Sequence, residues 1–116
     1  MLLFSLSLSA NAATSNICYK TGSELDLDSA SNQNTRAKLT NPDYFGPTGT
    51  AAPETLIFTT LPVVDSTTLI SNNCDIFYGG GSPVLSVAEA TDVRDWSQAG
   101  VNKFVLAGCD YASNNI

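Results

Sequence analysis

Residues 74–109 constrain the fold more than any other part of the chain. They contain a short apolar run at 75–78, a triple glycine, an amphipathic segment at 87–98 and a second apolar run at 104–107. The first run is too short for a helix and is rich in aromatic and β-branched side chains, which favours a strand. Because two strands joined by a helix of this length run parallel with a right-handed crossover, the sequence predicts a β-α-β unit.

The amphipathic segment carries a signal at each end. Ser86 stands three residues before Glu89, which is the spacing of a capping box at a helix start. Gly100 follows the last helical residues, where a left-handed C-terminal cap is expected. Apolar residues recur between these signals at helical spacing, and we expect them to face the core. They are Val87, Ala90, Val93 and Trp96.

The second apolar run is followed by few residues. Its four side chains, 104–107, are continuously apolar, as expected of a strand that is covered on both faces. Only Asp110–Ile116 remain to cover it after Cys109. We therefore expect an N-terminal piece of a longer protein, interrupted before the next helix, with a sheet that is incomplete at the C-terminus.

The preceding half of the chain predicts further alternation of strands and short helices. We expect strands at 16–20 and 55–61, a weak helix at 31–39 that Asn41-Pro42 ends, and a single helical turn at 65–70 capped by Asp65. The predicted fold class is therefore α/β, with three layers and a mostly parallel sheet of about four strands flanked by helices. The long polar stretch 23–53 is either a loop near a binding site or an ordinary surface excursion.

The N-terminus resembles a secretory signal peptide. An apolar run at 2–9 leads into Ala10-Asn11-Ala12, small residues that suit cleavage after Ala12. The run is too short to span a bilayer, and no Lys or Arg precedes it. We expect a signal peptide at 1–12, an α/β domain at 13–116, and export of a bacterial protein to the periplasm or the extracellular space. The alternative is a retained apolar strand.

Composition limits the classes of partner. The chain has 116 residues, a net charge of −6 and a sequence pI of about 4.1. Nucleic acids and anionic lipid surfaces both require basic patches, so we expect no nucleic-acid partner and no membrane span. An unidentified small molecule or an envelope or extracellular protein remains as the expected partner, and we expect no cofactor.

Three cysteines and the absence of histidine limit the chemistry. Cys18, Cys74 and Cys109 are spaced too widely for a zinc pattern. Three alternatives remain: all three cysteines are buried thiols, two of them form a disulfide and the third is free, or one of them is a reactive thiol. Asp26 and Asp28 form a close acidic pair, but no EF-hand loop surrounds them. We therefore expect no metal.

The C-terminal half combines an Asp-led strand running into Gly79-Gly80-Gly81, a helix ending in Trp-Ser-Gln-Ala-Gly, and the run Phe-Val-Leu-Ala-Gly-Cys that ends at Cys109. In this pattern it resembles the class I glutamine amidotransferase-like superfamily, which includes DJ-1/PfpI-like proteins with a flavodoxin-like α/β fold. The resemblance implies a nucleophile position at Cys109 and an oxyanion hole near the glycines. It also implies a carboxylate near Glu24.

The chain departs from the catalytic pattern of that superfamily. Catalytic members need a histidine to accept the thiol proton, and this chain contains none. Asp110 stands directly after Cys109, where a carboxylate disfavours the thiolate, and Tyr111 replaces a usual glycine.

We therefore expect an exported, non-catalytic domain that binds a ligand or partner at the rim formed by the carboxyl ends of its strands. The expected ligand-binding residues are Gly79, Gly80, Gly81 and Asp110. One alternative is a Cys-dependent hydrolase or amidotransferase-type enzyme with Cys109 as nucleophile. The other is a secreted structural or adhesive module.

Overall fold

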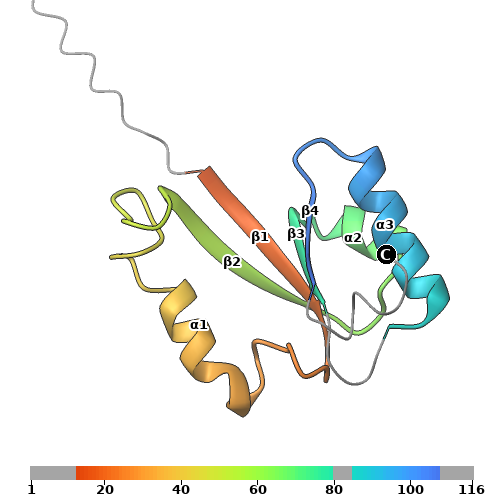
Figure 1. The fold of residues 1–116 in the computed structure, drawn as a ribbon, viewed down its shortest axis with the longest axis horizontal. Coiled ribbons are helices and arrows are strands. Elements are labelled where there is room, and N and C mark those ends of the chain that lie inside the picture. Colours follow the sequence, from red (N-terminus) through yellow and green to blue (C-terminus); the bar gives the residue numbers. More distant parts are fainter. Residues whose placement is uncertain (1–12, 80–84, 108–116) are drawn as a thin grey trace, which may run out of the picture.

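A four-stranded, all-parallel sheet forms the centre of the computed structural model, which describes residues 13–79 and 85–107 (Figure 1). Its strand order is β2-β1-β3-β4. The strands are β1 (Ala13–Lys20), β2 (Glu54–Leu61), β3 (Ile76–Gly79) and β4 (Phe104–Ala107). The sequence prediction of an α/β fold with a parallel sheet of about four strands is thus confirmed.

Helices flank the sheet on both faces and make the molecule three-layered. The short helix η1 (Ala30–Asn32) and α1 (Gln33–Leu39) lie on one face, and α2 (Ser66–Ser71) and α3 (Val87–Ala99) lie on the other (Figure 1). The weak helix and the single helical turn expected before and after β2 therefore both form.

The β-α-β unit predicted from residues 74–109 is present. Strands β3 and β4 are parallel neighbours with Phe77 paired to Val105, and α3 connects them. Trp96 of α3 is 5% exposed and packs in the core, as its place in the apolar stripe predicts.

Both helices on this face begin with a capping box, which satisfies backbone N–H groups that have no partner within the helix. The Ser86 hydroxyl accepts from the Glu89 N–H at 3.1 Å, and the Ser86 N–H donates to Glu89 Oε1 at 3.0 Å. In α2, the Thr68 N–H donates to Asp65 Oδ1 at 2.8 Å. The starts of both helices are therefore set by local sequence.

Two details of α3 differ from the sequence prediction. Val87 is 78% exposed, because it is the first helical residue and its side chain tilts back beyond the helix start, where no turn supports it. Gly100 is extended, with φ −90° and ψ 155°, and Asn102 takes the positive φ instead. A Cβ at position 100 would lie 2.4 Å from Lys103 Cγ, so a larger residue there would require the Lys103 side chain to move.

The main core lies between the sheet and the layer of α2 and α3. A disulfide joins Cys18 in β1 to Cys74 just before β3, with 5.8 Å between the two Cα atoms. Both cysteines are fully buried among apolar side chains. The other core residues are Leu61, Val64, Leu69, Phe77, Leu85, Ala90, Val93 and Trp96, with Val105 packed against them.

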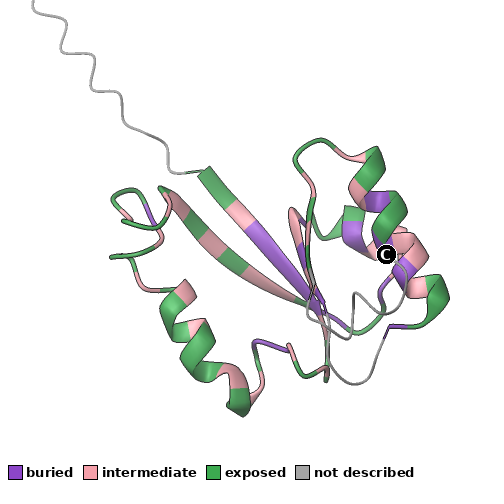
Figure 2. Ribbon diagram, in the orientation of Figure 1, coloured by how far each residue is buried: buried purple, intermediate pink, exposed green. Residues whose placement is uncertain are grey.

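A smaller core lies on the α1 face. It is built from Ile17, Tyr19 and Leu27, and the partly buried Leu39 and Phe58 pack against it. Helix α1 itself has no buried residue (Figure 2). The layer on this side of the sheet is therefore attached through the loop after β1 and through partly buried side chains.

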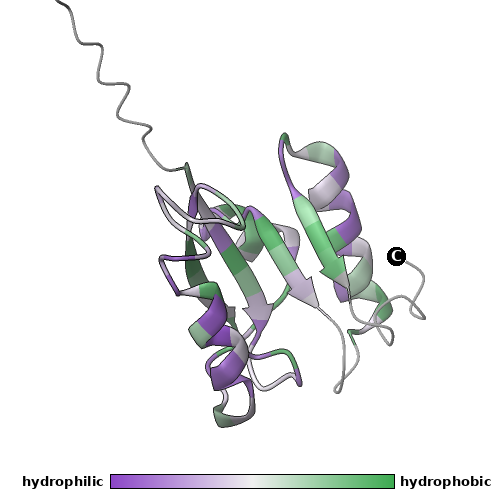
Figure 3. Cartoon of the chain, turned by 60° about the vertical axis from the view of Figure 1, so that its left-hand side comes forward, coloured by the Kyte–Doolittle hydropathy of each residue, from purple (hydrophilic) through white to green (hydrophobic). Residues whose placement is uncertain are grey.

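The α1 face of β4 is exposed, in contrast to the prediction of a strand covered on both faces. Phe104 and Leu106 are 58% and 52% exposed, whereas Val105 points to the main core. Figure 3 shows the strongly hydrophobic colour of β4 beside the more hydrophilic helices. Leu106 lines a hollow of about 230 Å³ together with Thr35 and Leu39 of α1, so the described part of the chain covers this face of β4 only incompletely.

Candidate functional site

The carboxyl ends of the four strands meet at one edge of the sheet, which we call the carboxyl edge. Its members are the last residues of the strands: Lys20, Leu61, Gly79 and Ala107. From β1 the chain crosses to β2 on one side, and then returns to β3 on the other side of β1. Such a reversal is a topological switch point, and open α/β sheets bind ligands outside the carboxyl ends at that point.

Pairing between the two strands at the switch point is short. The register of β1 and β3 covers Ile17 with Ile76 and Cys18 with Phe77, and it stops two residues before Lys20 and Gly79. By contrast, β1 and β2 are paired through to their last residues. The ladder therefore does not extend to the carboxyl edge between β1 and β3.

An ion pair lies at this edge. Lys20, the last residue of β1, places its Nζ 3.0 Å from Oε2 and 3.1 Å from Oε1 of Glu89 in the first turn of α3. Both side chains are about one-fifth exposed. The pair therefore connects the end of the central strand to the helix start on the main-core face.

The environment of Glu89 favours its charged form. Partial burial raises the pKa of this carboxyl, but the hydrogen bond from the Ser86 N–H and the Lys20 ammonium outweigh burial and lower the pKa below its ordinary value. Glu89 is therefore ionised at neutral pH and neutralises Lys20.

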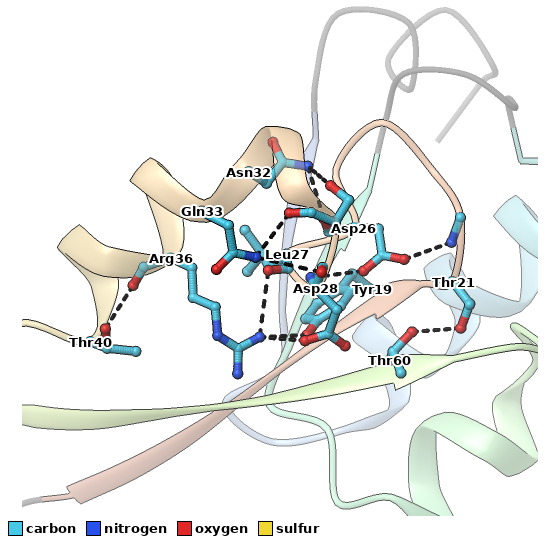
Figure 4. A network of polar contacts seen from close by, with 12 residues as sticks. Tyr19, Thr21, Asp26, Leu27, Asp28, Asn32, Gln33, Arg36, Thr40 and Thr60 are labelled. Carbon is cyan, nitrogen blue, oxygen red and sulfur yellow. Dashed lines mark hydrogen bonds and ion pairs between the residues drawn. The ribbon is translucent and has the colours of Figure 1, made fainter.

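The loop after β1 is held by the carboxylate of Asp26. Its Oδ2 accepts from the Gly22 N–H at 2.7 Å, and its Oδ1 accepts from the Asp28 N–H at 2.9 Å (Figure 4). At the start of the same loop, the hydroxyls of Thr21 and Thr60 lie 2.5 Å apart. These bonds fix the backbone where the chain leaves the switch point.

Arg36 anchors α1 to this loop and to the sheet. Its guanidinium donates to Asp28 (Figure 4). The guanidinium carbon also lies 4.9 Å from the ring centroid of Phe58. Nη1 also lies 3.5 Å from the Tyr19 hydroxyl. Burial and the nearby Asp28 carboxylate raise the pKa of Tyr19 to about 12, so this phenol stays neutral and cannot serve as a base near neutral pH.

Only part of the predicted site lies within the described residues. Gly79 is buried at the end of β3, on the carboxyl edge, and its role in ligand binding stays a prediction. Gly80, Gly81, Cys109 and Asp110 lie outside the described residues, so their predicted roles stay predictions.

Glu24 is exposed in the loop after β1. Its carbonyl oxygen accepts from Asn32 Nδ2 at 2.7 Å, and within the described residues its carboxylate forms no ion pair. The described residues therefore provide no ion-pair partner for this carboxylate.

The cysteine alternatives left open by the sequence are partly decided. Cys18 and Cys74 form a disulfide, which leaves Cys109 as the third cysteine of the chain. Asp26 and Asp28, the close acidic pair, bond to backbone N–H groups and to Arg36 respectively. Among residues 13–79 and 85–107, no three His, Cys, Asp or Glu side chains are grouped closely enough to hold a metal ion.

Sequence reasoning identified Glu89 as a capping residue but missed its partner Lys20. The signal was present, because Lys20 is the last residue of a predicted strand and Glu89 opens the predicted helix. Their contact depends on α3 packing beside β1, which the order of the strands decides and local sequence does not.

Two further findings concern the whole chain. In the described ranges, no helix is both long and apolar enough to cross a bilayer. No model of a known protein family, no curated protein and no solved structure matches the chain.

Proposed function

We propose that this protein is an exported, non-catalytic ligand-binding domain of the amidotransferase-like type, and that its ligand occupies the carboxyl edge between β1 and β3. The observation that carries the proposal is the switch point, where the pairing of β1 and β3 stops before Lys20 and Gly79. Ligands of open α/β sheets bind at such points. The strand order is also that of the first four strands of a flavodoxin-like sheet, which supports the resemblance.

The polar groups at the edge support binding of a small polar ligand. Lys20 and Glu89 supply one charge of each sign, and Thr21, which follows Lys20 in the chain, supplies a hydroxyl. A zwitterion or a neutral polar molecule suits this balance better than a strongly charged one, because the ion pair is already neutral.

The disulfide supports the proposed export. Disulfides persist in the periplasm and outside the cell and are rare in the cytosol, where thiols are kept reduced. Cys18 and Cys74 are fully buried and paired, so their bond belongs to the folded core rather than to an exposed redox site.

Amide chemical shifts of 15N-labelled protein, titrated with L-glutamine, L-glutamate, D-glucose and adenosine monophosphate, test the proposal. We expect at least one probe to shift the amides of 20–23, 79 and 86–89 in a saturable way. Amides at the opposite ends of the strands, such as those of Thr14 and Thr55, serve as the internal control. Unmoved edge amides with every probe, or saturable shifts confined to other regions, would reject the carboxyl edge as the site.

The enzymatic alternative has its own test. The disulfide takes two of the three cysteines and leaves Cys109 for thiol chemistry, which is the feature that keeps this alternative open. A catalytic thiolate reacts with iodoacetamide much faster than free cysteine at neutral pH. If Cys109 reacts no faster than free cysteine, the Cys-dependent enzyme is excluded and the binding domain remains.

A further inference from the structure

Figure 1 shows α1 and the loop 41–52 that leads into the amino end of β2. Residues of α1 and of this loop line an open cleft away from the carboxyl edge. This open cleft has a volume of about 670 Å³. That volume is within the range of sites for small molecules, roughly 300–1,000 Å³. On one side it is lined by α1 and the segment just after it, and on the other by the loop, the lining residues being Asn34, Ala37, Lys38 and Asn41, then Tyr44, Phe45 and Ala51.

The α1 side of the cleft combines helical residues with the segment just after the helix. Asn34, Ala37 and Lys38 belong to α1, where residues three and four apart lie on one face, and Asn41 follows the helix end. Within the described residues the Asn34 amide and the Lys38 ammonium have no hydrogen-bond partner. Asn41, which also lines the cleft, accepts from the Asp43 N–H at 2.9 Å through Oδ1, and no described residue accepts from its Nδ2.

The loop side of the cleft is built on a fixed backbone. The N–H groups of Ala51 and Ala52 both donate to the Tyr44 carbonyl, at 2.9 and 3.1 Å, and the Thr50 N–H donates to the Asp43 carbonyl at 2.9 Å. A Cβ at Gly49 would lie 2.5 Å from the Tyr44 carbonyl oxygen, so the two backbone segments are in direct contact. Tyr44 is 46% exposed and lines the cleft. Because its backbone is held by these hydrogen bonds, we expect its aromatic side chain to need little rearrangement when a ligand binds.

Lys38 differs from every other cation of the chain. Lys20, Arg36, Arg94 and Lys103 are each paired with a carboxylate. Lys38 is the fifth and last cationic side chain, and it forms no ion pair with any described residue. In a chain of net charge −6, a free ammonium in a cleft without acidic lining attracts an anionic group on a ligand.

We propose that this cleft binds an acidic sugar, a pyranose that carries a carboxylate. The C–H face of the ring stacks on Tyr44, the amides of Asn34 and Asn41 hydrogen-bond hydroxyl groups, and Lys38 pairs with the carboxylate. A single ammonium with three N–H donors suits one carboxylate. Phosphate sites commonly add an arginine guanidinium or a cluster of free backbone N–H groups. The described lining residues of this cleft provide neither.

Isothermal titration with a trimer of galacturonic acid and with the matched neutral trimer of galactose tests the proposal. We expect the wild-type protein to bind the acidic trimer at least about tenfold more tightly than the neutral one, because a charge-assisted hydrogen bond adds roughly that factor. Lys38→Gln should remove this preference and leave weak binding of both trimers. Tyr44→Ala should weaken binding of both trimers by a similar factor.

Arg94→Gln is the matched control, because it removes the same charge from α3 on the other face of the sheet and should leave both affinities unchanged. Lys38 and Tyr44 are exposed, so neither substitution should prevent folding. Lack of binding of the acidic trimer, equal affinity for the two trimers, or a preference that survives Lys38→Gln would each overturn the proposal. None of these outcomes bears on the proposal of a ligand at the carboxyl edge, because the residues of that edge lie at the opposite ends of the strands.

Discussion

At the scale of single residues, Glu89 has two roles at once. Its carboxylate closes the capping box of α3 and neutralises Lys20 at the end of β1. Because both partners favour the charged form, the pKa of Glu89 is lower in the folded chain than in the unfolded chain. The contribution of Glu89 to stability is therefore complete at pH values above its pKa in the unfolded chain. It is lost as the pH falls through the pKa of Glu89 in the folded chain.

Glu89→Gln should lower the free energy of unfolding by about 1 kcal/mol at neutral pH, since it weakens the cap and removes the ion pair. Urea unfolding at about pH 7 and about pH 3 measures the effect, and the difference from wild type should be smaller at the lower pH, because the Glu89 carboxylate takes up a proton as the pH falls through its folded pKa. Glu24→Gln is the control and should leave the free energy of unfolding unchanged, because Glu24 is exposed and forms no ion pair with a described residue. A difference that is as large at the lower pH as at the higher would contradict the electrostatic account.

Gly49 is required by a close approach of backbone to backbone. Gly49→Ala would place a Cβ 2.5 Å from the Tyr44 carbonyl oxygen and 2.6 Å from the Ala52 carbonyl oxygen, so the loop beside α1 must open. We expect a loss of roughly 2 kcal/mol or more in unfolding free energy. Gly22→Ala is the control, because its Cβ would meet nothing within 4 Å and only its φ of +76° is unfavourable, at about 1 kcal/mol. Equal losses in the two variants would show that the loop 41–52 is looser than described.

At the scale of elements, the features predicted from sequence are those with local causes. Asp65 and Ser86 each satisfy backbone N–H groups three residues away, so both helix starts can be read directly from the chain. The apolar spacing of Ala90, Val93 and Trp96 likewise fixes which side of α3 is buried. Parallel pairing followed from the helix that connects β3 to β4.

Features that depend on strand order were not accessible from sequence. Cys18 and Cys74 are separated by 56 residues, and they pair because β3 lies beside β1 rather than beside β2. The same order brings Lys20 to Glu89. The cleft beside α1 was missed for a related reason, since the contact of α1 with the loop 41–52 leaves no periodic signal in the chain.

Strand β4 offers a test at this scale, because its two faces have opposite environments. Val105→Ala should lower the unfolding free energy by about 1–2 kcal/mol, since it removes methyl groups that pack on the main core. Leu106→Ser should change it by less than about 0.5 kcal/mol, because Leu106 is largely exposed. Both are measured by urea unfolding of the same protein. A large loss for Leu106→Ser would mean that this face of β4 is covered in solution.

At the scale of the whole molecule, the disulfide is the strongest constraint on the unfolded chain. The bond joins Cys18 and Cys74, which are 56 positions apart in the sequence. In the chain-entropy model, closing a loop of this length in the unfolded chain stabilises the folded state by about 4 kcal/mol. The stabilisation acts on the sheet as a unit, because β1 and β3 are both central strands.

Cys18→Ala combined with Cys74→Ala should therefore lower the unfolding free energy by about 4 kcal/mol, and reduction of the wild type should have a similar effect. Urea unfolding with and without dithiothreitol measures both. Peptide mapping without reductant should recover Cys18 and Cys74 in one cross-linked pair. Recovery of either residue as a free thiol would contradict the structure, and it would remove the main support for export.

The position of this cross-link also decides how the molecule responds to a cut. The segment between the two half-cystines includes α1, the loop 41–52 and all of the edge strand β2. A protease that cleaves once inside that segment leaves two peptides that are still covalently joined and still paired side by side in the sheet. Such a nicked protein migrates as one species until its cystine is reduced, so survival in a protease-rich space does not require an uncut backbone.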